Sequence, residues 1–236
     1  MFIDMHTHEL RYSKDSFLML EQMVELAKRR GLDALCVTDH DDMGLKEFAA
    51  EYSKKENFPI FVGIEFYSLQ GDIIAFGIDE YPSERVSAQE FIDLVQAQGG
   101  MCFAAHPFRN NNRGLEENLK IVKGLDGIEV LNGSTPFEPN KKAVDYAREL
   151  GKATLGSSDC HVIEKAGIYA TWFPREIHTL EELIQAVKNR ECRPAYYKDG
   201  GYHLWDMENP VPAPFTITDE TCEGMVDYRY TECEYM

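Results

Sequence analysis

The chain has 236 residues, 44% hydrophobic and 28% charged, a composition that fits one large globular domain with a substantial core. Its formal charge of −17 argues against binding to an extended nucleic-acid duplex, because the phosphate backbone requires a basic face. No apolar run approaches the roughly 20 residues of a membrane span, and no signal-peptide pattern precedes the first strand. The six cysteines form no CxxC pair, so we expect free thiols, a cytoplasmic location and no membrane partner.

Helix and strand signals alternate along most of the chain. Strands are expected at residues 1–5, 34–38, 60–65, 72–77, 101–106, 127–131, 153–157 and 168–173. Helices are expected at residues 16–30, 44–56, 87–98, 115–122, 139–150 and 180–189, the first with Ser16 as N-cap and Gly31 as C-cap. Repeated strand–helix units predict parallel strands joined by right-handed crossovers, which close into an α/β barrel of about seven units.

The alternation stops after about Tyr196. Gly200, Gly201 and three prolines interrupt an acidic, aromatic-rich stretch there. We therefore expect a folded domain over residues 1–195 and a C-terminal acidic extension over residues 196–236. The extension is expected to wrap the surface or to be partly disordered, and a lid over a site is the less favoured alternative.

Two histidines lie one residue apart at the end of the first predicted strand, in the stretch Asp4-Met5-His6-Thr7-His8. Side chains alternate across a strand, so His6 and His8 project from the same face. Two imidazoles on one face are well placed to bind one metal ion, although a His-x-His pair alone is weak evidence.

Further ligand-type residues follow other predicted strands. His40 follows residues 34–38, Glu65 ends the strand at 60–65, and His106 ends the strand at 101–106. Asp159 and His161 follow residues 153–157. Because the carboxyl ends of barrel strands meet at one mouth, these residues predict a shared metal site. Imidazole and carboxylate donors favour zinc, manganese or iron over calcium.

The order of these motifs resembles that of the PHP (polymerase and histidinol phosphatase) superfamily. The matching stretches are DMHTH followed by SKD, then TDHD, GIE, AHPFR and SSDCH, which together span roughly residues 1 to 175. The resemblance implies a distorted seven-stranded (β/α) barrel of the PHP type, with two or three divalent transition metals (Zn, Mn or Fe) at its mouth. It also implies the hydrolysis of a phosphate ester.

The resemblance assigns a ligand role to eight residues. A first metal would be bound by His6, His8, Glu65 and Asp159. Glu65 would bridge to a second metal that also binds His106, and a third metal would be bound by Asp15, His40 and His161. Asp15 has an alternative role, since it lies directly before Ser16 and would also suit a helix cap.

One departure from the family pattern concerns the second metal. Relatives with three metals place a further histidine in the strand after the glutamate, whereas residues 72–79 contain none. We therefore expect the second metal to be weakly bound or absent, unless Asp79 reaches it.

Substrate contacts are less well marked than metal ligands. Arg109 follows the AHPF stretch and would clamp a phosphate with its guanidinium, although an exposed loop arginine is the alternative. Arg113 and Lys165 are weaker candidates of the same kind. Asn132 and Ser134 follow a strand and would donate hydrogen bonds to substrate, although Asn-Gly-Ser also suits an ordinary turn. Glu129 is expected to be a strand residue facing the interior or the helices, and His178 a surface residue.

The favoured function is a phosphoesterase in which a metal-bound water, its pKa lowered to about 7, supplies hydroxide to attack phosphorus. No serine or cysteine has a recognisable triad context. A metal-dependent hydrolase of C–N bonds and a non-catalytic, metal-stabilised regulatory module are the alternatives. The expected partner is a small phosphorylated metabolite, a nucleotide or a short oligonucleotide end, and the pattern does not determine the substrate or the oligomeric state.

Overall fold

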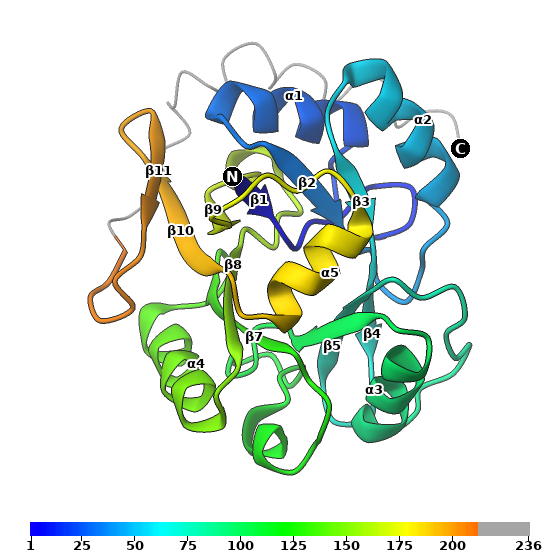
Figure 1. The fold of residues 1–236 in the computed structure, drawn as a ribbon, viewed down its shortest axis with the longest axis vertical. Coiled ribbons are helices and arrows are strands. Elements are labelled where there is room, and N and C mark those ends of the chain that lie inside the picture. Colours follow the sequence, from blue (N-terminus) through cyan, green and yellow to red (C-terminus); the bar gives the residue numbers. More distant parts are fainter. Residues whose placement is uncertain (212–236) are drawn as a thin grey trace.

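The structure is a computed structural model that describes residues 1–211 (Figure 1). Its eleven strands in this range are β1 (Phe2–Asp4), β2 (Ala34–Val37), β3 (Ile60–Val62), β4 (Ile64–Tyr67), β5 (Asp72–Phe76), β6 (Met101–Ala104), β7 (Gly127–Asn132), β8 (Ala153–Ser157), β9 (Tyr169–Trp172), β10 (Arg193–Lys198) and β11 (Gly201–Leu204). The α-helices are α1 (Leu20–Arg30), α2 (Lys46–Glu56), α3 (Ala88–Ala97), α4 (Phe137–Leu150) and α5 (Leu180–Lys188). Two short 3₁₀ helices are η1 (Glu116–Lys120) and η2 (Ile163–Lys165).

The strands form two mixed sheets. One has the order β11-β10-β9-β1-β2-β3, and the other has the order β4-β5-β6-β7-β8. Figure 1 shows the strands surrounding a central region with α1 to α4 on the outside, while α5 lies across the middle of the view. The mixed α/β class is therefore as predicted, but the described residues contain no closed seven-stranded sheet.

One junction between the sheets lies at Gly63. The predicted strand 60–65 is divided there into β3, which pairs with β2, and β4, which pairs with β5. A Cβ at Gly63 would lie 2.5 Å from the carbonyl oxygen of Ala75, so only glycine allows the backbones to approach this closely. Beyond the junction the sheets are connected by a single bridge between His40 and Glu65.

The other junction lies between β8 and β9. The Thr171 hydroxyl donates to the carbonyl oxygen of Gly156 and accepts from its backbone N–H, in place of a regular backbone ladder. Just beyond it, Thr7 and Cys160 form a second isolated bridge, and the Asp159 N–H donates to the His6 carbonyl. Both bridges therefore lie among the ligand-type residues of the sequence.

The prediction of parallel strands is only partly correct. The pairs β1–β2, β2–β3, β6–β7 and β7–β8 are parallel, whereas β5 is antiparallel to both of its neighbours and β9 is antiparallel to β1. Residues 68–71 alone connect β4 to β5, and a connection this short permits only a hairpin.

Several local expectations change as well. The first helix begins at Leu20, because the Ser16 hydroxyl donates to the His8 carbonyl instead of capping a helix. Gly31 ends that helix in the left-handed conformation, as predicted. The helix expected over 115–122 is the 3₁₀ turn η1. The chain remains folded beyond residue 196, where β10 and β11 form a hairpin, and the acidic extension after residue 211 lies outside the described residues.

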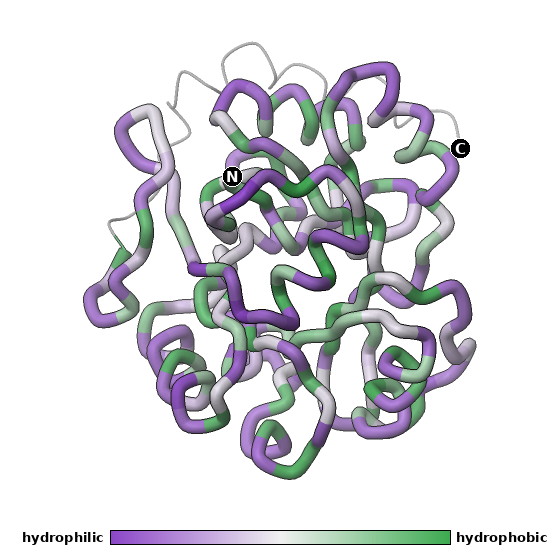
Figure 2. The backbone as a smooth tube through the Cα atoms, viewed as in Figure 1, coloured by the Kyte–Doolittle hydropathy of each residue, from purple (hydrophilic) through white to green (hydrophobic). Residues whose placement is uncertain are grey.

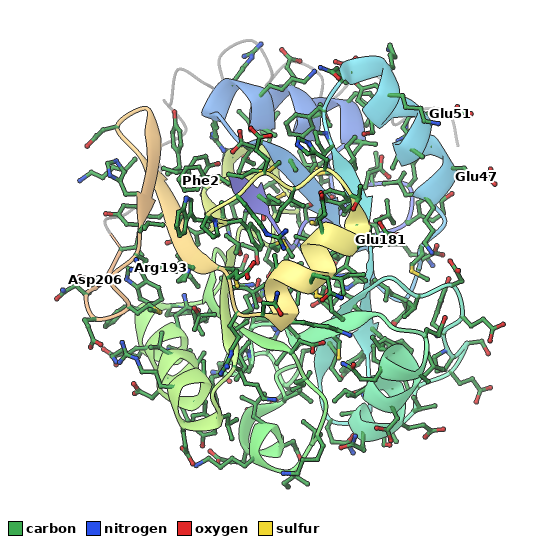
Figure 3. All side chains as sticks on the ribbon, in the orientation of Figure 1. Phe2, Glu47, Glu51, Glu181, Arg193 and Asp206 are labelled. Carbon is green, nitrogen blue, oxygen red and sulfur yellow. The ribbon has the colours of Figure 1, made fainter. Side chains whose placement is uncertain are left out.

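Helix α5 packs against the strands and covers one part of the hydrophobic core. Buried side chains of β1, β2, β5, β6 and β8 form one apolar cluster with Leu183, Ile184, Ala186 and Val187 of α5. Hydrophilic residues occupy the outer turns of the helices and the loops (Figure 2). Figure 3 shows Glu47 and Glu51 on the outside of α2, and both side chains are exposed. No helix among residues 1–211 is long and apolar enough to cross a membrane.

Candidate metal centre

Four side chains converge on one buried point at the carboxyl ends of the strands. The Nε2 atoms of His6 and His8 lie 2.9 Å apart. Asp159 Oδ1 is 3.4 Å from each of these nitrogens, and Glu65 Oε2 is 3.5 Å from His6 Nε2 and 3.4 Å from His8 Nε2. All four residues are buried. The structure thus brings together the set that the resemblance assigns to the first metal.

The second group extends from the other oxygen of Glu65. Glu65 Oε1 is 2.9 Å from His106 Nε2, and Asp72 Oδ2 is 3.8 Å from that nitrogen. Asp72, at the start of β5, was not predicted to belong to the site. Asp79, suggested as the replacement for the missing histidine, is 98% exposed and pairs with Lys46, so it does not reach the site. Asp72, and not Asp79, is the carboxylate that lies beside His106 in this second group.

The third group faces the mouth of the site. Asp15 Oδ2 is 3.3 Å from His40 Nε2 and 3.5 Å from His161 Nε2. The rings of His40 and His161 both pack against His8, with centroids 4.3 and 4.1 Å from it and 5.7 Å from each other. Asp15 itself is 61% exposed, which makes it the most accessible of the eight predicted ligands.

The residues present fit a metal ion on their own chemistry. Glu65 Oε2 is buried and makes no well-formed hydrogen bond among residues 1–211, although His6, His8 and His40 nitrogens lie within 3.5 Å of it. A buried acceptor without such a bond is costly unless something else satisfies it. Clustered imidazole and carboxylate donors without a thiolate suit zinc, manganese or iron.

The electrostatics of the protein without metal keep the carboxylates charged. Burial opposes the ionisation of Glu65, but the charge on His6, the hydrogen bond from His106 and the nearby His40 ring hold its pKa well below the usual range. Burial likewise opposes the ionisation of Asp159, yet His6 and the other neighbouring histidines lower its pKa. Two ionised carboxylates are therefore available to bind a cation.

The histidines divide into protonated and neutral ones. Burial lowers the pKa of His8 to about 3, which keeps its ring neutral. Burial would also lower the pKa of His40, but its close contact with Glu65 and the charges of Glu65 and Asp15 raise it to about 9. A metal ion that binds through His40 must therefore displace a proton.

The backbone is strained at two of the predicted ligands. His106 has a φ of 28° and Asp159 a φ of 50°, in the left-handed region that residues other than glycine seldom adopt. Such conformations persist only where neighbouring contacts impose them. The Asp159 N–H donates to the His6 carbonyl and the His106 N–H donates to the Glu129 carboxylate. These hydrogen bonds orient the side chains of His106 and Asp159 toward His6.

Three of the predicted substrate contacts differ in their surroundings. Arg109 is partly exposed, and its guanidinium donates to Asp159 Oδ2 at 2.8 Å, on the side away from the histidines. Lys165 Nζ donates to the Ser134 hydroxyl at 3.0 Å at the same end of the strands. Asn132 is fully buried, and its amide nitrogen donates to the Glu129 and Asp159 carboxylates. Asn132 therefore has no accessible surface for a substrate.

Two residues of the site were missed or undervalued. The guanidinium of Arg113 clamps the Asp72 carboxylate, with its Nε 2.7 Å from Oδ2 and its terminal nitrogen 3.0 Å from Oδ1. Glu129, in the middle of a fully buried strand, accepts a hydrogen bond from His6 Nδ1 at 3.1 Å. A charged residue inside such a strand is a usable signal, since charges are seldom buried without partners. His178 is exposed and pairs with Glu176, as expected of a surface residue.

An α/β fold whose imidazoles and carboxylates gather at the carboxyl ends of its strands defines a metal-binding enzyme scaffold. The chain belongs to the PHP domain family, whose model matches residues 4–149, and the PHP-associated model matches residues 137–192. It is 26% identical over 142 residues to uncharacterized protein MJ1587 of Methanocaldococcus jannaschii, covering 56% of this chain and 82% of that protein.

Two solved structures share the fold. One is described as a putative metal-dependent phosphoesterase from Bifidobacterium adolescentis, with a TM-score of 0.60, 19% identity, and coverage of 80% of this chain and 96% of that one. The other is the lesion-specific endonuclease PfuEndoQ from Pyrococcus furiosus, with a TM-score of 0.62, 18% identity, and coverage of 80% and 56%. Family membership and the donor set together support a metal-dependent hydrolase.

Proposed function

We propose that the protein is a metal-dependent phosphoesterase that hydrolyses a small phosphorylated metabolite, a nucleotide or a short oligonucleotide end. The observation that carries the proposal is the convergence of His6, His8, Glu65 and Asp159, with donor atoms 2.9 to 3.5 Å apart in a buried cluster. When bound, divalent ions at such a site supply Lewis acidity, which activates water and neutralises phosphoryl oxygens.

The side chains around the cluster support a phosphate ester as the substrate. Arg109 lies beside Asp159 with a partly exposed guanidinium, the group that pairs with phosphate oxygens through two parallel hydrogen bonds. Lys165 provides a second cation at the same mouth. These positive charges occur in a chain whose formal charge is −17, so they mark a local exception to an acidic surface. That surface also argues against a long duplex as substrate.

The site residues have separate tasks in this proposal. His6, His8, Glu65 and Asp159 bind the ions, and His40, His161 and Asp15 close the mouth with further donors. Arg109 orients the phosphoryl group. None of the four cysteines among the described residues is placed to act as a covalent nucleophile, because all four are buried and lie outside the cluster. Burial raises the pKa of their thiols, which keeps them unreactive.

The proposal is tested by metal loading and a substrate panel. Purified protein stripped of metal is loaded with Mn²⁺, Zn²⁺ or Fe²⁺, and we expect at least two equivalents to bind per chain. The loaded protein is then assayed on phosphate monoesters, phosphodiesters and amides. Hydrolysis of a phosphate ester supports the proposal. Binding of less than one equivalent, or cleavage of amides alone, would refute it.

Arg109→Gln refines the test for phosphate. Since Arg109 donates to Asp159 Oδ2, whereas Oδ1 is the oxygen near His6 and His8, the variant should keep its metals. We expect a higher KM for phosphate esters with a smaller change in kcat. An unchanged KM would show that the phosphate binds elsewhere.

A further inference from the structure

Glu129 lies directly beneath the metal cluster, in the middle of β7, and is 0% exposed. Its oxygen Oε1 is 3.1 Å from His6 Nδ1 and accepts a hydrogen bond from the Ser157 hydroxyl at 2.6 Å. Its oxygen Oε2 accepts from the His106 backbone N–H at 2.7 Å and from the Asn132 amide at 3.0 Å. Four donors therefore surround one buried carboxylate.

These four hydrogen bonds connect Glu129 to three of the predicted ligands. It contacts the ring of His6 and the backbone of His106 directly. It reaches Asp159 through Asn132, whose amide nitrogen also donates to Asp159 Oδ2 at 3.1 Å. His6, His106 and Asp159 form one of the groups whose donor atoms lie within 4.8 Å of one another. Glu129 is therefore linked to all three residues, to His6 and His106 directly and to Asp159 through Asn132.

The contact with His6 has a specific chemical consequence. A carboxylate facing Nδ1 favours the tautomer in which Nδ1 carries the proton, so that Nε2 presents its lone pair. His6 Nε2 is the nitrogen that faces His8, Glu65 and Asp159. A hydrogen bond at the outer nitrogen also fixes the plane of the ring and raises the basicity of the inner nitrogen.

We propose that Glu129 is the positioning residue of the metal centre. It holds His6 in the tautomer that binds metal and holds the backbone of His106 and the side chain of Asn132 in place. The proposal concerns metal binding and not turnover. It rests on the metal centre of the proposed function but adds a residue outside the predicted ligand set.

Glu129→Gln is a sharp test because the amide cannot replace the carboxylate in this environment. A carboxylate has about four lone-pair sites for four donors, whereas an amide has two and directs its own N–H groups at the remaining donors. Replacement of such an outer partner typically lowers metal affinity about 10–100-fold. We expect a loss of that size when Zn²⁺ or Mn²⁺ is titrated calorimetrically into metal-free protein.

Asp126→Asn is the matched control. Asp126 directly precedes β7, and its Oδ2 accepts from the Cys102 backbone N–H and from the Gln96 amide, each at 3.0 Å. The variant makes the same change from carboxylate to amide next to the same strand, without contact with the cluster. It should keep the metal affinity of wild type. A fall equal to that of Glu129→Gln would show a general effect of the substitution and overturn the proposal.

A second readout separates positioning from simple structural support. The ¹⁵N shifts of the His6 ring in Zn²⁺-loaded protein report which ring nitrogen carries the proton and which binds the ion. We expect the Nδ1-protonated form in wild type and a mixture or the opposite form in Glu129→Gln. If Glu129→Gln does not fold, Ser157→Ala tests the proposal in its place. It removes one hydrogen-bond donor to Glu129 Oε1 and should weaken metal binding severalfold.

The outcomes distinguish this proposal from the proposed function. If wild type binds no metal, both the centre and the positioning role fail. If wild type binds metal and a folded Glu129→Gln, or else Ser157→Ala, binds it equally well, only the role of Glu129 is refuted. An affinity loss together with a changed His6 tautomer establishes the role.

Discussion

Glu65 should be the most damaging single ligand to replace, because it contacts donors of the first and second groups and also His40 of the third. Its Oε2 lies 3.5, 3.4 and 2.8 Å from nitrogens of His6, His8 and His40, while its Oε1 lies 2.9 Å from His106 Nε2. Glu65→Gln keeps the size of the side chain but removes the negative charge that both groups share. A cation in either group therefore loses an ionic ligand.

The magnitude follows from the position of the side chain. Replacing a residue that only hydrogen-bonds to a ligand costs about 10–100-fold in metal affinity. A direct ligand should cost more than about 100-fold, or more than about 2.7 kcal/mol, at each of two positions. Asp15→Asn is the comparison, since Asp15 is 61% exposed and its ion pairs within residues 1–211 are with His40 and His161. It should lower metal content only at the third position.

The assay is a metal count on both variants and wild type after identical loading, with the fold checked by circular dichroism. We expect Glu65→Gln to lose metal from two positions and to lose hydrolysis, while Asp15→Asn keeps at least the first metal. If Glu65→Gln retains every metal that wild type binds, Glu65 does not bridge.

Three further predictions follow from the site. Asp159→Asn should abolish hydrolysis and leave the fold intact by circular dichroism, whereas the exposed His178→Ala should retain full activity; equal activities would place the site elsewhere. Because the pKa of His40 is about 9 without metal, binding should release a proton, and the affinity should rise as pH increases from about 6.5 to 9. Calorimetry in two buffers of different ionisation enthalpy counts that proton, and a pH-independent affinity would contradict the assignment. Gly133→Ala should impair metal binding, since a Cβ there would lie 2.3 Å from the Ser158 carbonyl oxygen beside Asp159; a crystal structure with an unmoved turn would disprove it.

The alternation of strand and helix signals was readable from sequence because it reflects local periodicity. Apolar runs of three to five residues ended at ligand-type residues, and those residues lie together in the structure at the carboxyl ends of the strands. The convergence could be predicted because strand ends that share a direction must meet at one edge. The family was recognisable because these motifs follow its order along the chain, and its model matches residues 4–149.

The division into two sheets depends on contacts between distant segments. The run at 60–65 reads as one strand, and only the approach of Ala75 to Gly63 shows why the chain changes partners there. The hairpin that reverses β5 also places Asp72 beside His106, on the strand where the family's histidine was missing. The short connection at residues 68–71 favours a hairpin, but spacing along the chain does not show that Asp72 lies beside His106.

The support beneath the ligands was decided by tertiary structure alone. Glu129 is one acidic residue in an apolar strand, and its sequence context does not reveal the four donors that surround it. Asn132 follows in an Asn-Gly-Ser stretch typical of a turn, yet it is buried between two carboxylates. Candidate ligands are recognised by residue type and local position, so the sequence was enough to propose them. The orientation of those ligands arises from hydrogen bonds between β1, β6, β7 and β8, which exist only once the sheets have assembled.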